Sequence, residues 1–421
     1  MKQSTTTISN SIAQQQPVIS IGLCGHVDHG KTTLLEKLSG KWADTHSEEL
    51  KRGITIRLGY ADVVFRKCEN CGEYAYTVQE TCPNCKGEAI PVRKVSFVDA
   101  PGHESLMATM LSGAAIIDGA LILVSAAEKC PQPQTREHVT ALEIIGIKNV
   151  IVVQNKIDMV DKERALENYK EIKEFLKGTA YENVPIIPIS AQYGANLDKL
   201  IWAIETYIKT PSRDVNKDPV MLVARSFDIN RPGTMPKDMK GGVLGGALKS
   251  GKLSAGQDIE IRPGRLVEEK NQKMWKPILT RIAALNTGGM QVEEIYPGGS
   301  FGLLTMLDPA IVKSDSLTGA VIGLPGKLPK VWDEMALEVK LLERVVGASD
   351  ELKVEPIKMN EILMLNVNSA ATVGIVYEIT KNKVKARLKL PVCAEEGSRV
   401  TISRRVGNRY RLIGYGIIVK K

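Results

Sequence analysis

Short apolar runs alternate with amphipathic stretches through the first half of the chain. Such runs are typical of buried parallel strands, and the stretches between them have the periodicity of helices. We therefore expect a doubly wound, mostly parallel α/β sheet that binds ligands at the carboxyl ends of its strands. The expected helices are Thr32–Leu38, Glu104–Ile117, Thr135–Ile145, Lys162–Leu176 and Leu197–Ile208, and the expected strands include Ala120–Val124, Val150–Val153 and Ile186–Ile189.

The pattern changes after Thr210 to short strands separated by Gly, Pro, Asn and Asp, which is typical of an all-β sandwich or barrel. A Pro/Gly/Lys-rich break at Leu324–Lys330 divides this half in two. We therefore predict an α/β domain followed by two all-β barrels. The expected segments are a disordered tail at 1–17, the α/β domain at 18–208, and barrels at 209–326 and 327–421.

The composition is that of a globular protein, with 43% hydrophobic and 25% charged residues among 421. The tail is rich in Ser, Thr and Gln and has no apolar core, so we expect no signal peptide. No run approaches the length of a membrane span, and we expect a cytoplasmic protein with reduced cysteines. A net charge of +8 mildly favours a polyanionic partner such as nucleic acid.

The first apolar run leads into Gly25-His-Val-Asp-His-Gly30-Lys31-Thr32, the pattern of a phosphate-binding loop. Its glycines let successive amides point at phosphate oxygens. We expect Lys31 to reach the β- and γ-phosphates and the Thr32 hydroxyl to bind magnesium. A glycine-rich turn with a chance Lys-Thr is the alternative. The further nucleotide contacts expected here are Asp28, His29 and Thr33.

Two later segments are expected to sense the γ-phosphate. Gly53-Ile-Thr55 ends a polar stretch, and the Thr55 hydroxyl would bind magnesium until hydrolysis, although a plain strand start has the same pattern. Another strand ends in Asp99-Ala-Pro-Gly102-His103. Asp99 would hold magnesium and Gly102 would offer its amide to the γ-phosphate. His103 would orient the attacking water, unless it is a surface histidine after a turn. Lys31, Thr55 and His103 are thus the predicted catalytic residues.

The residues expected to recognise the base follow two later strands. Asn155-Lys156-Ile-Asp158 follows one strand, and Ser190-Ala191-Gln192 follows another. The Asp158 carboxylate can accept from guanine N1–H and the exocyclic amine, a donor pair that adenine lacks. We therefore predict GTP or GDP as the ligand. Asn155 would brace the loop, Lys156 would lie over the ring, and the Ala191 amide would meet guanine O6.

Two Cys-x-x-Cys pairs, Cys68/Cys71 and Cys82/Cys85, lie within the segment 66–88. Each pair can offer two thiolates to one tetrahedral zinc ion, so we predict a structural zinc knuckle. Four unrelated thiols or a redox pair are the alternatives. The other cysteines, Cys24, Cys130 and Cys393, are expected to be small apolar fillers.

These motifs, with Pro131-Gln-Pro-Gln-Thr-Arg-Glu-His138, resemble those of translational GTPases of the elongation factor Tu class. The cysteine insertion, the segment Leu307–Gly323, and Pro391-Val-Cys-Ala-Glu-Glu-Gly397 with Tyr410–Gly416 resemble the gamma subunit of archaeal and eukaryotic initiation factor 2. This resemblance covers the chain from about Val18 to its end, and the short tail favours the archaeal branch.

The resemblance implies GTP-dependent carriage of initiator methionyl-tRNA to the small ribosomal subunit and the mRNA start complex, in a trimer with alpha and beta subunits. It implies a tRNA acceptor end held between the GTPase domain and the first barrel, for which Arg225, Phe227, Arg281 and Asn286 are candidates; ordinary barrel surface is the alternative. Rival functions are an elongation factor, a selenocysteine-specific factor and the GTPase subunit of a sulfate-activating enzyme. The lack of an appended domain after Lys421 is expected to count against the selenocysteine type only.

Asp28 places a carboxylate close to the expected phosphates, where like charges at 4 Å cost about 4 kcal/mol at an effective dielectric of 20. It either points to solvent or pairs with a lysine, or it binds a second magnesium ion together with the Gly53 carbonyl. The sequence leaves both alternatives open.

Overall fold

A computed structural model describes residues 16–40, 59–99, 111, 113, 115–269, 272–346, 352–407 and 409–420. Its first half contains one seven-stranded sheet in the order β3-β2-β4-β1-β5-β6-β7. Strands β4, β1, β5, β6 and β7 run parallel, and β2 pairs with β4 in the antiparallel direction. The strands are β1 (Ile19–Gly25), β2 (Gly59–Lys67), β3 (Tyr76–Thr77), β4 (Ile90–Asp99), β5 (Gly119–Ser125), β6 (Asn149–Asn155) and β7 (Ile186–Pro188).

Helices cover both faces of this sheet, which explains why β1, β5 and β6 are almost wholly buried. One face packs against apolar residues of α2 (Lys31–Ser39) and α7 (Leu197–Tyr207), and the other against those of α5 (Pro133–Ile145) and α6 (Lys162–Leu176). The predicted doubly wound sheet is confirmed. The expected helix Glu104–Ile117 lies mostly outside the described residues.

The second half consists of two β-barrels, as predicted. In the first, β11, β16, β8, β9, β15 and β12 form a ring that the β11–β12 pairing closes. Its strands are β8 (Val220–Phe227), β9 (Val243–Ser250), β11 (Asp258–Glu269), β12 (Gln272–Thr287), β15 (Phe301–Thr305) and β16 (Val321–Gly323), with β10 (Leu253–Ser254), β13 (Met290–Val292), β14 (Glu294–Ile295) and the short helix α8 (Pro309–Val312) at its margin.

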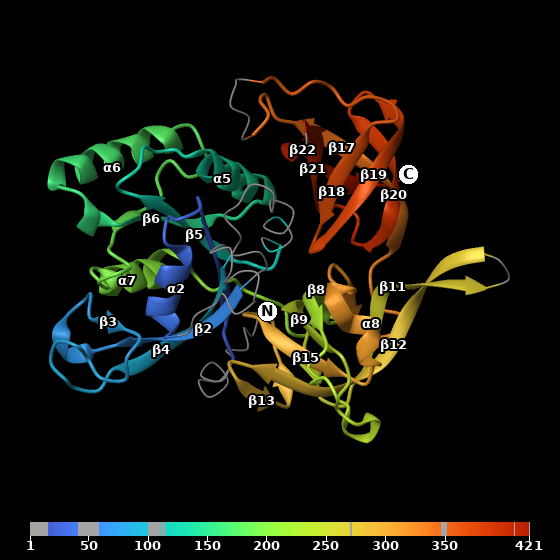
Figure 1. The fold of residues 1–421 in the computed structure, drawn as a ribbon, viewed down its shortest axis with the longest axis horizontal. Helices are drawn as coiled ribbons and strands as arrows, with labels where there is room; N and C mark the ends of the chain where they lie inside the picture. The colour runs from blue at the N-terminus through green and yellow to red at the C-terminus, as the bar shows by residue number, and fades with distance from the viewer. Residues whose placement is uncertain are drawn as a thin grey trace, which may run out of the picture.

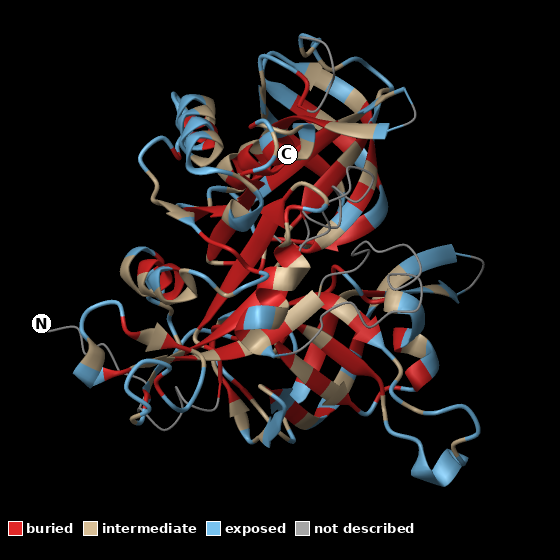
Figure 2. Cartoon of the chain, turned by 60° about the vertical axis from the view of Figure 1, so that its left-hand side comes forward, coloured by how far each residue is buried: buried red, intermediate tan, exposed pale blue. Residues whose placement is uncertain are grey.

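The second barrel closes in the order β17-β20-β19-β18-β21-β22. Its strands are β17 (Val331–Leu341), β18 (Ile362–Val367), β19 (Ala370–Thr380), β20 (Lys383–Cys393), β21 (Arg399–Val406) and β22 (Arg409–Val419). In both barrels the inward side chains alternate with outward ones, so each barrel has its own apolar core. Figure 2 shows buried and more exposed residues alternating along the strands of the barrels.

The α/β unit contacts both barrels (Figure 1). Helix α5 packs against β21 and β22 of the second barrel. On the first barrel, Gln16 is buried and donates to the Gly298 carbonyl at 2.9 Å, and Pro17 lies against Gly299. The sequence analysis placed Gln16 and Pro17 in a disordered tail, whereas here both are buried and lie against the first barrel. Within the described part of the chain, no helix is long and apolar enough to cross a membrane.

Candidate functional site

The turn between β1 and α2 adopts a backbone that requires glycine at two positions. Gly25 has φ +141° and Gly30 has φ +89°. A Cβ atom would lie 2.5 Å from the Leu123 carbonyl oxygen at Gly25 and 2.4 Å from Asn155 Nδ2 at Gly30. Both spacings are shorter than any real Cβ contact, so a side chain at either position would displace β5 or the Asn155 loop. The predicted phosphate-binding loop therefore has the curled backbone that its amides need.

The polar groups of the loop converge at the carboxyl ends of β1 and β4. The Lys31 ammonium donates to the Gly25 carbonyl at 3.0 Å and to the His26 carbonyl at 2.8 Å. The Thr32 hydroxyl donates to Asp99 Oδ2 at 3.0 Å, and Asp99 is fully buried. A hydroxyl and a carboxylate held together are oxygen ligands of the kind that magnesium prefers, so the donor set fits this metal.

Asn155 joins the predicted phosphate loop to the loops that were predicted to recognise the base. Its Nδ2 donates to the His29 carbonyl at 2.9 Å, and its Oδ1 accepts from the Ala191 amide at 2.9 Å. The structure thus brings together three segments that the sequence analysis named separately. Ser190 is buried beside Ala191, whereas Asp158 and Gln192 lie exposed at the rim. Lys156 has φ +63°, which turns the chain sharply after β6.

Two buried histidines connect the loop to its neighbours, α5 and β5. His138 on α5 is buried and accepts the Gly25 amide at Nδ1, at 2.8 Å. Burial, helped by the charge of Lys31, lowers the pKa of His138 to about 3, so the ring is neutral and carries its proton on Nε2. His29 is also buried, and its Nδ1 lies 2.9 Å from the Leu123 carbonyl. Burial lowers the pKa of His29 as well.

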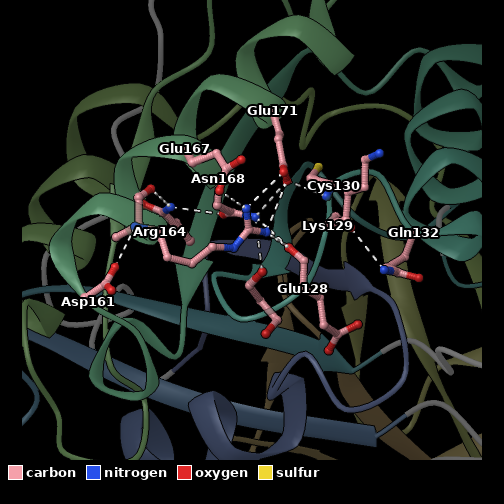
Figure 3. A network of polar contacts seen from close by, with 12 residues as sticks. Glu128, Lys129, Cys130, Gln132, Asp161, Arg164, Glu167, Asn168 and Glu171 are labelled. Carbon is pink, nitrogen blue, oxygen red and sulfur yellow. Dashed lines mark hydrogen bonds and ion pairs between the residues drawn. The ribbon is translucent and has the colours of Figure 1, made fainter.

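The loop between β5 and α5 reaches His29 from the other side and is anchored on α6 (Figure 3). Glu128 Oε2 lies 3.5 Å from His29 Nε2. The Glu128 carbonyl accepts from Arg164 at 2.8 Å and from Asn168 at 2.9 Å, and Glu171 pairs with Arg164 at 3.0 Å. Helix α6 therefore fixes the backbone next to the phosphate loop.

The sequence analysis gave no role to His138, Glu128 or Arg164. The motif that contains His138 was noted only for its resemblance, and Arg164 was covered only by the expected helix Lys162–Leu176. Four predicted residues, Gly53, Thr55, Gly102 and His103, lie outside the described residues. Asp28 is exposed with φ +62°, and Thr33 is half-buried at the start of α2.

The four knuckle cysteines form a compact cluster. All four Sγ atoms lie within 4.8 Å of one another. Cys68 Sγ is 3.5 Å from Cys85 Sγ, and Cys82 Sγ is 3.7 Å from Cys71 Sγ. Zinc–sulfur bonds of about 2.3 Å in a tetrahedron separate sulfurs by about 3.8 Å, so the cluster fits zinc. Backbone amides at Cys85 and Asn84 lower the pKa of Cys82 to about 6, which favours a thiolate there. The predicted fillers Cys24, Cys130 and Cys393 are all buried.

On the first barrel, strand pairing places Arg225 and Asn286 at the two ends of one row. Arg225 on β8 pairs with Gly245 on β9, Gly245 with Gly302 on β15, and Gly302 with Asn286 on β12. A Cβ atom at Gly245 or Gly302 would meet nothing closer than 3.7 Å, so packing does not demand glycine at either position. The row lies on the outer face of the barrel, where Gly245 and Gly302 carry no side chain, and the exposed Phe227 lies next to Gly245.

The Arg225 end of this row adjoins the α/β unit. Arg225 Nε pairs with Asp315 at 3.1 Å. Burial raises the pKa of Tyr60 on β2, whose neighbouring charges are Arg225 and Asp315. Arg281 is not part of the row, because it lies beyond an irregularity in β12 and pairs with exposed Asp258 at 2.8 Å.

Comparisons with known proteins agree with this architecture. Residues 16–210 match the model of the elongation factor Tu GTP binding domain, and residues 333–418 match that of the C-terminal part of initiation factor eIF2 gamma. Two solved structures show the same fold. They are a bacterial selenocysteine-specific elongation factor (TM-score 0.72, 24% identity, 96% of this chain and 58% of that one) and the factor SelB from Methanococcus maripaludis with a GTP analogue (0.70, 23%, 96% and 80%).

Sequence relatives are far more similar. The translation initiation factor 2 subunit gamma of Pyrococcus horikoshii is 58% identical over 404 residues, which cover 96% of this chain and 98% of the relative. That of Methanothermobacter thermautotrophicus is 59% identical over 406 residues, covering 96% and 100%. The rival selenocysteine factors share the fold at under 25% identity. The chain therefore belongs to the family of gamma subunits of translation initiation factor 2, and it is a translational GTPase that acts in initiation.

Proposed function

We propose that the chain carries initiator methionyl-tRNA to the small ribosomal subunit in the cytoplasm when GTP is bound, and releases it after hydrolysis. Its partners would be the alpha and beta subunits of the same factor. The observation that carries the proposal is the row of Arg225, Gly245, Gly302 and Asn286 on the outer face of the first barrel, which adjoins the GTPase unit in a chain of this family.

The guanine nucleotide would lie across the loop that Asn155 braces. The amides of Gly25–Thr32 and the Lys31 ammonium would hold the phosphates, and Asp158 would accept from the edge of guanine. Asn155 would keep these parts in register through its contacts with His29 and Ala191. A carboxylate that reads guanine in this way can reject the wrong base by roughly 10⁴-fold.

Magnesium would be held by Thr32 and Asp99, with Thr55 added while GTP is intact. Bound there, the ion supplies charge neutralisation across the β- and γ-phosphates. His103 would orient the attacking water. Because no arginine is placed by sequence to share the transition-state charge, hydrolysis by the chain alone should be slow, at about 10⁻⁴ to 10⁻² s⁻¹. A His103→Ala variant should lower stimulated hydrolysis and leave GTP affinity nearly unchanged.

Asp28 is exposed, so both roles considered for its side chain can be tested. Its exposed side chain can reach solvent, or it can hold a second magnesium ion with the Gly53 carbonyl. The test variant is Asp28→Asn, since asparagine tolerates the left-handed backbone at φ +62°. A lowered hydrolysis rate and one metal fewer in a GTP-analogue structure would support the second ion. An unchanged rate with a single metal would leave Asp28 solvated.

The tRNA proposal is tested at the two glycines of this row. Gly302→Ala and Gly245→Ala add a methyl group that the barrel tolerates, because the nearest atoms lie at 3.7 Å or more. Each variant should weaken binding of initiator methionyl-tRNA while GTP affinity stays unchanged. Ala371→Val, which adds bulk at an exposed strand position of the other barrel, is the matched control. If both glycine variants bind the tRNA as tightly as wild type, the acceptor end is held elsewhere.

A further inference from the structure

Two arginines of the C-terminal barrel hold helix α5 near its two ends. Arg411 on β22 forms a buried ion pair with Glu137, in the second turn of the helix. Arg399 on β21 donates to the Ile144 carbonyl, in the last turn. The Arg399 guanidinium also lies over the Tyr415 ring, 4.7 Å from its centroid, which fixes its direction.

Both contacts suit the helix physically. A cation beside the last carbonyls of a helix is favoured by the helix dipole. Arg411 neutralises a carboxylate that is 4% exposed, and loss of the arginine would leave that charge buried and unpaired. The barrel therefore sets the position of α5 rather than merely touching it.

The residue after Glu137 is His138, whose Nδ1 accepts the Gly25 amide at 2.8 Å. The backbone at Gly25 is also paired with Leu123 of β5, the neighbouring strand of the sheet. A displacement of α5 would therefore be passed to the first residue of the phosphate loop. Consecutive residues of one helix thus face the C-terminal barrel and the nucleotide site.

We infer that Arg411 and Arg399 are positioning residues for the phosphate loop, acting through α5 and His138 on the Gly25 amide. The second barrel is then part of the nucleotide site's support, and a partner that moved this barrel would change how long the nucleotide stays bound. The inference rests on the proposed placement of the phosphates on the Gly25–Thr32 loop.

The test is the dissociation rate of a fluorescent GDP from the full chain, measured by chase with unlabelled GDP. Arg399→Met should release GDP about fivefold to tenfold faster, and Arg411→Met at least as fast. Arg399→Met is the safer variant because its partner is a carbonyl and no buried charge is left behind. Arg387→Met is the matched control, since Arg387 also forms an ion pair in this barrel, with Glu334 at 3.1 Å, but is 72% exposed.

A double-mutant cycle separates positioning from general loss of stability. If Arg399 acts through His138, the variant Arg399→Met/His138→Phe should release GDP no faster than His138→Phe alone. Fully additive effects, or arginine variants that fold and release GDP within about twofold of wild type, would overturn the inference. A Lys31→Ala variant with wild-type GDP affinity would instead overturn the proposed nucleotide site, so the two failures are distinguishable.

Discussion

Two small polar sites on the α/β unit are built in opposite ways. One is the zinc knuckle. The other, which we call the nucleotide corner, is the proposed nucleotide site formed by the Gly25–Thr32 loop, Asn155 and His138. Asn155 reaches the His29 carbonyl 126 positions away, and His138 reaches Gly25 across 113 positions. The knuckle cysteines all lie within 68–85, and their sulfurs contact one another. Figure 1 shows the knuckle at the far edge of the sheet, by β3, away from the C-terminal barrel.

This difference determines how much of each site a single substitution disturbs. A site made of long-range hydrogen bonds depends on the placement of several elements, so one substitution disturbs them together. A metal cluster formed by adjacent turns depends on its ion and little else. We therefore expect the loss of a cysteine to affect only the knuckle. The loss of one residue of the nucleotide corner should disturb all of that corner.

Loss of a knuckle thiolate should have the largest effect, confined to zinc. Cys82→Ser removes one of four sulfur ligands, and structural zinc contributes about 10 kcal/mol or more to such modules. We expect about one zinc per chain in wild type by metal analysis and none in the variant, with GTP affinity unchanged. Zinc-free wild type with an intact insert would contradict this account, as would a Cys82→Ser chain that no longer binds GTP.

Asn155→Ala should damage the nucleotide corner at two places at once. It leaves the His29 carbonyl and the Ala191 amide without their partner, and each unsatisfied buried group costs about 1 to 3 kcal/mol. GTP affinity measured by titration calorimetry should fall by about 10²-fold or more, while the zinc content stays that of wild type. A loss smaller than about threefold would show that Asn155 does not join the loops.

The pH dependence of the free energy of unfolding should reflect the protonation of His138. Its pKa is about 3 in the folded protein and about 6.5 when exposed, so the unfolded chain takes up a proton that the folded chain refuses. The stability it contributes is present above pH 6.5 and is lost as the pH falls towards 3. Between pH 6.5 and 5.5 the free energy of unfolding should fall by about 1 kcal/mol from this residue.

Urea unfolding at the two pH values measures that slope. His138→Gln keeps an acceptor for the Gly25 amide and has no proton to take up, so its stability should depend less on pH. An equal slope in both proteins would mean that His138 is not the buried neutral group described here.

The smallest effect is expected at Glu128. Its carbonyl is held by Arg164 and Asn168, whereas its carboxylate is 37% exposed and only approaches His29 at 3.5 Å. Glu128→Gln should therefore change GDP affinity by less than about twofold, in keeping with weak exposed ion pairs. A tenfold change would mean that the carboxylate itself is part of the nucleotide site.

Local patterns predicted the α/β unit well where the physical cause is local. Helix α6 has the predicted bounds, and its first residue follows Asp161, whose side chain accepts the Arg164 amide at 2.7 Å as an N-cap. The phosphate loop and the cysteine pairs are likewise short motifs. The close grouping of the four thiols was expected from the spacing of the two Cys-x-x-Cys pairs.

What the sequence could not reveal depends on register and long-range packing. Gly245 and Gly302 lie in one row only because β9 pairs with β15 in one register, which strand patterns do not specify. The Glu137–Arg411 pair joins residues 274 positions apart, and neither has a local signal. Gln16 belongs to a compositionally disordered tail, yet its side chain is buried by the Tyr296–Gly298 segment of the first barrel.

The most direct test of the proposed carrier function is the affinity for initiator methionyl-tRNA with GTP analogue and with GDP, in one preparation with the alpha and beta subunits present. We predict tight binding with the analogue, binding at least about tenfold weaker with GDP, and weaker binding still for an elongator methionyl-tRNA. Equal affinity in the two nucleotide states, or no preference for the initiator tRNA, would contradict the proposal that this GTPase is a switched carrier.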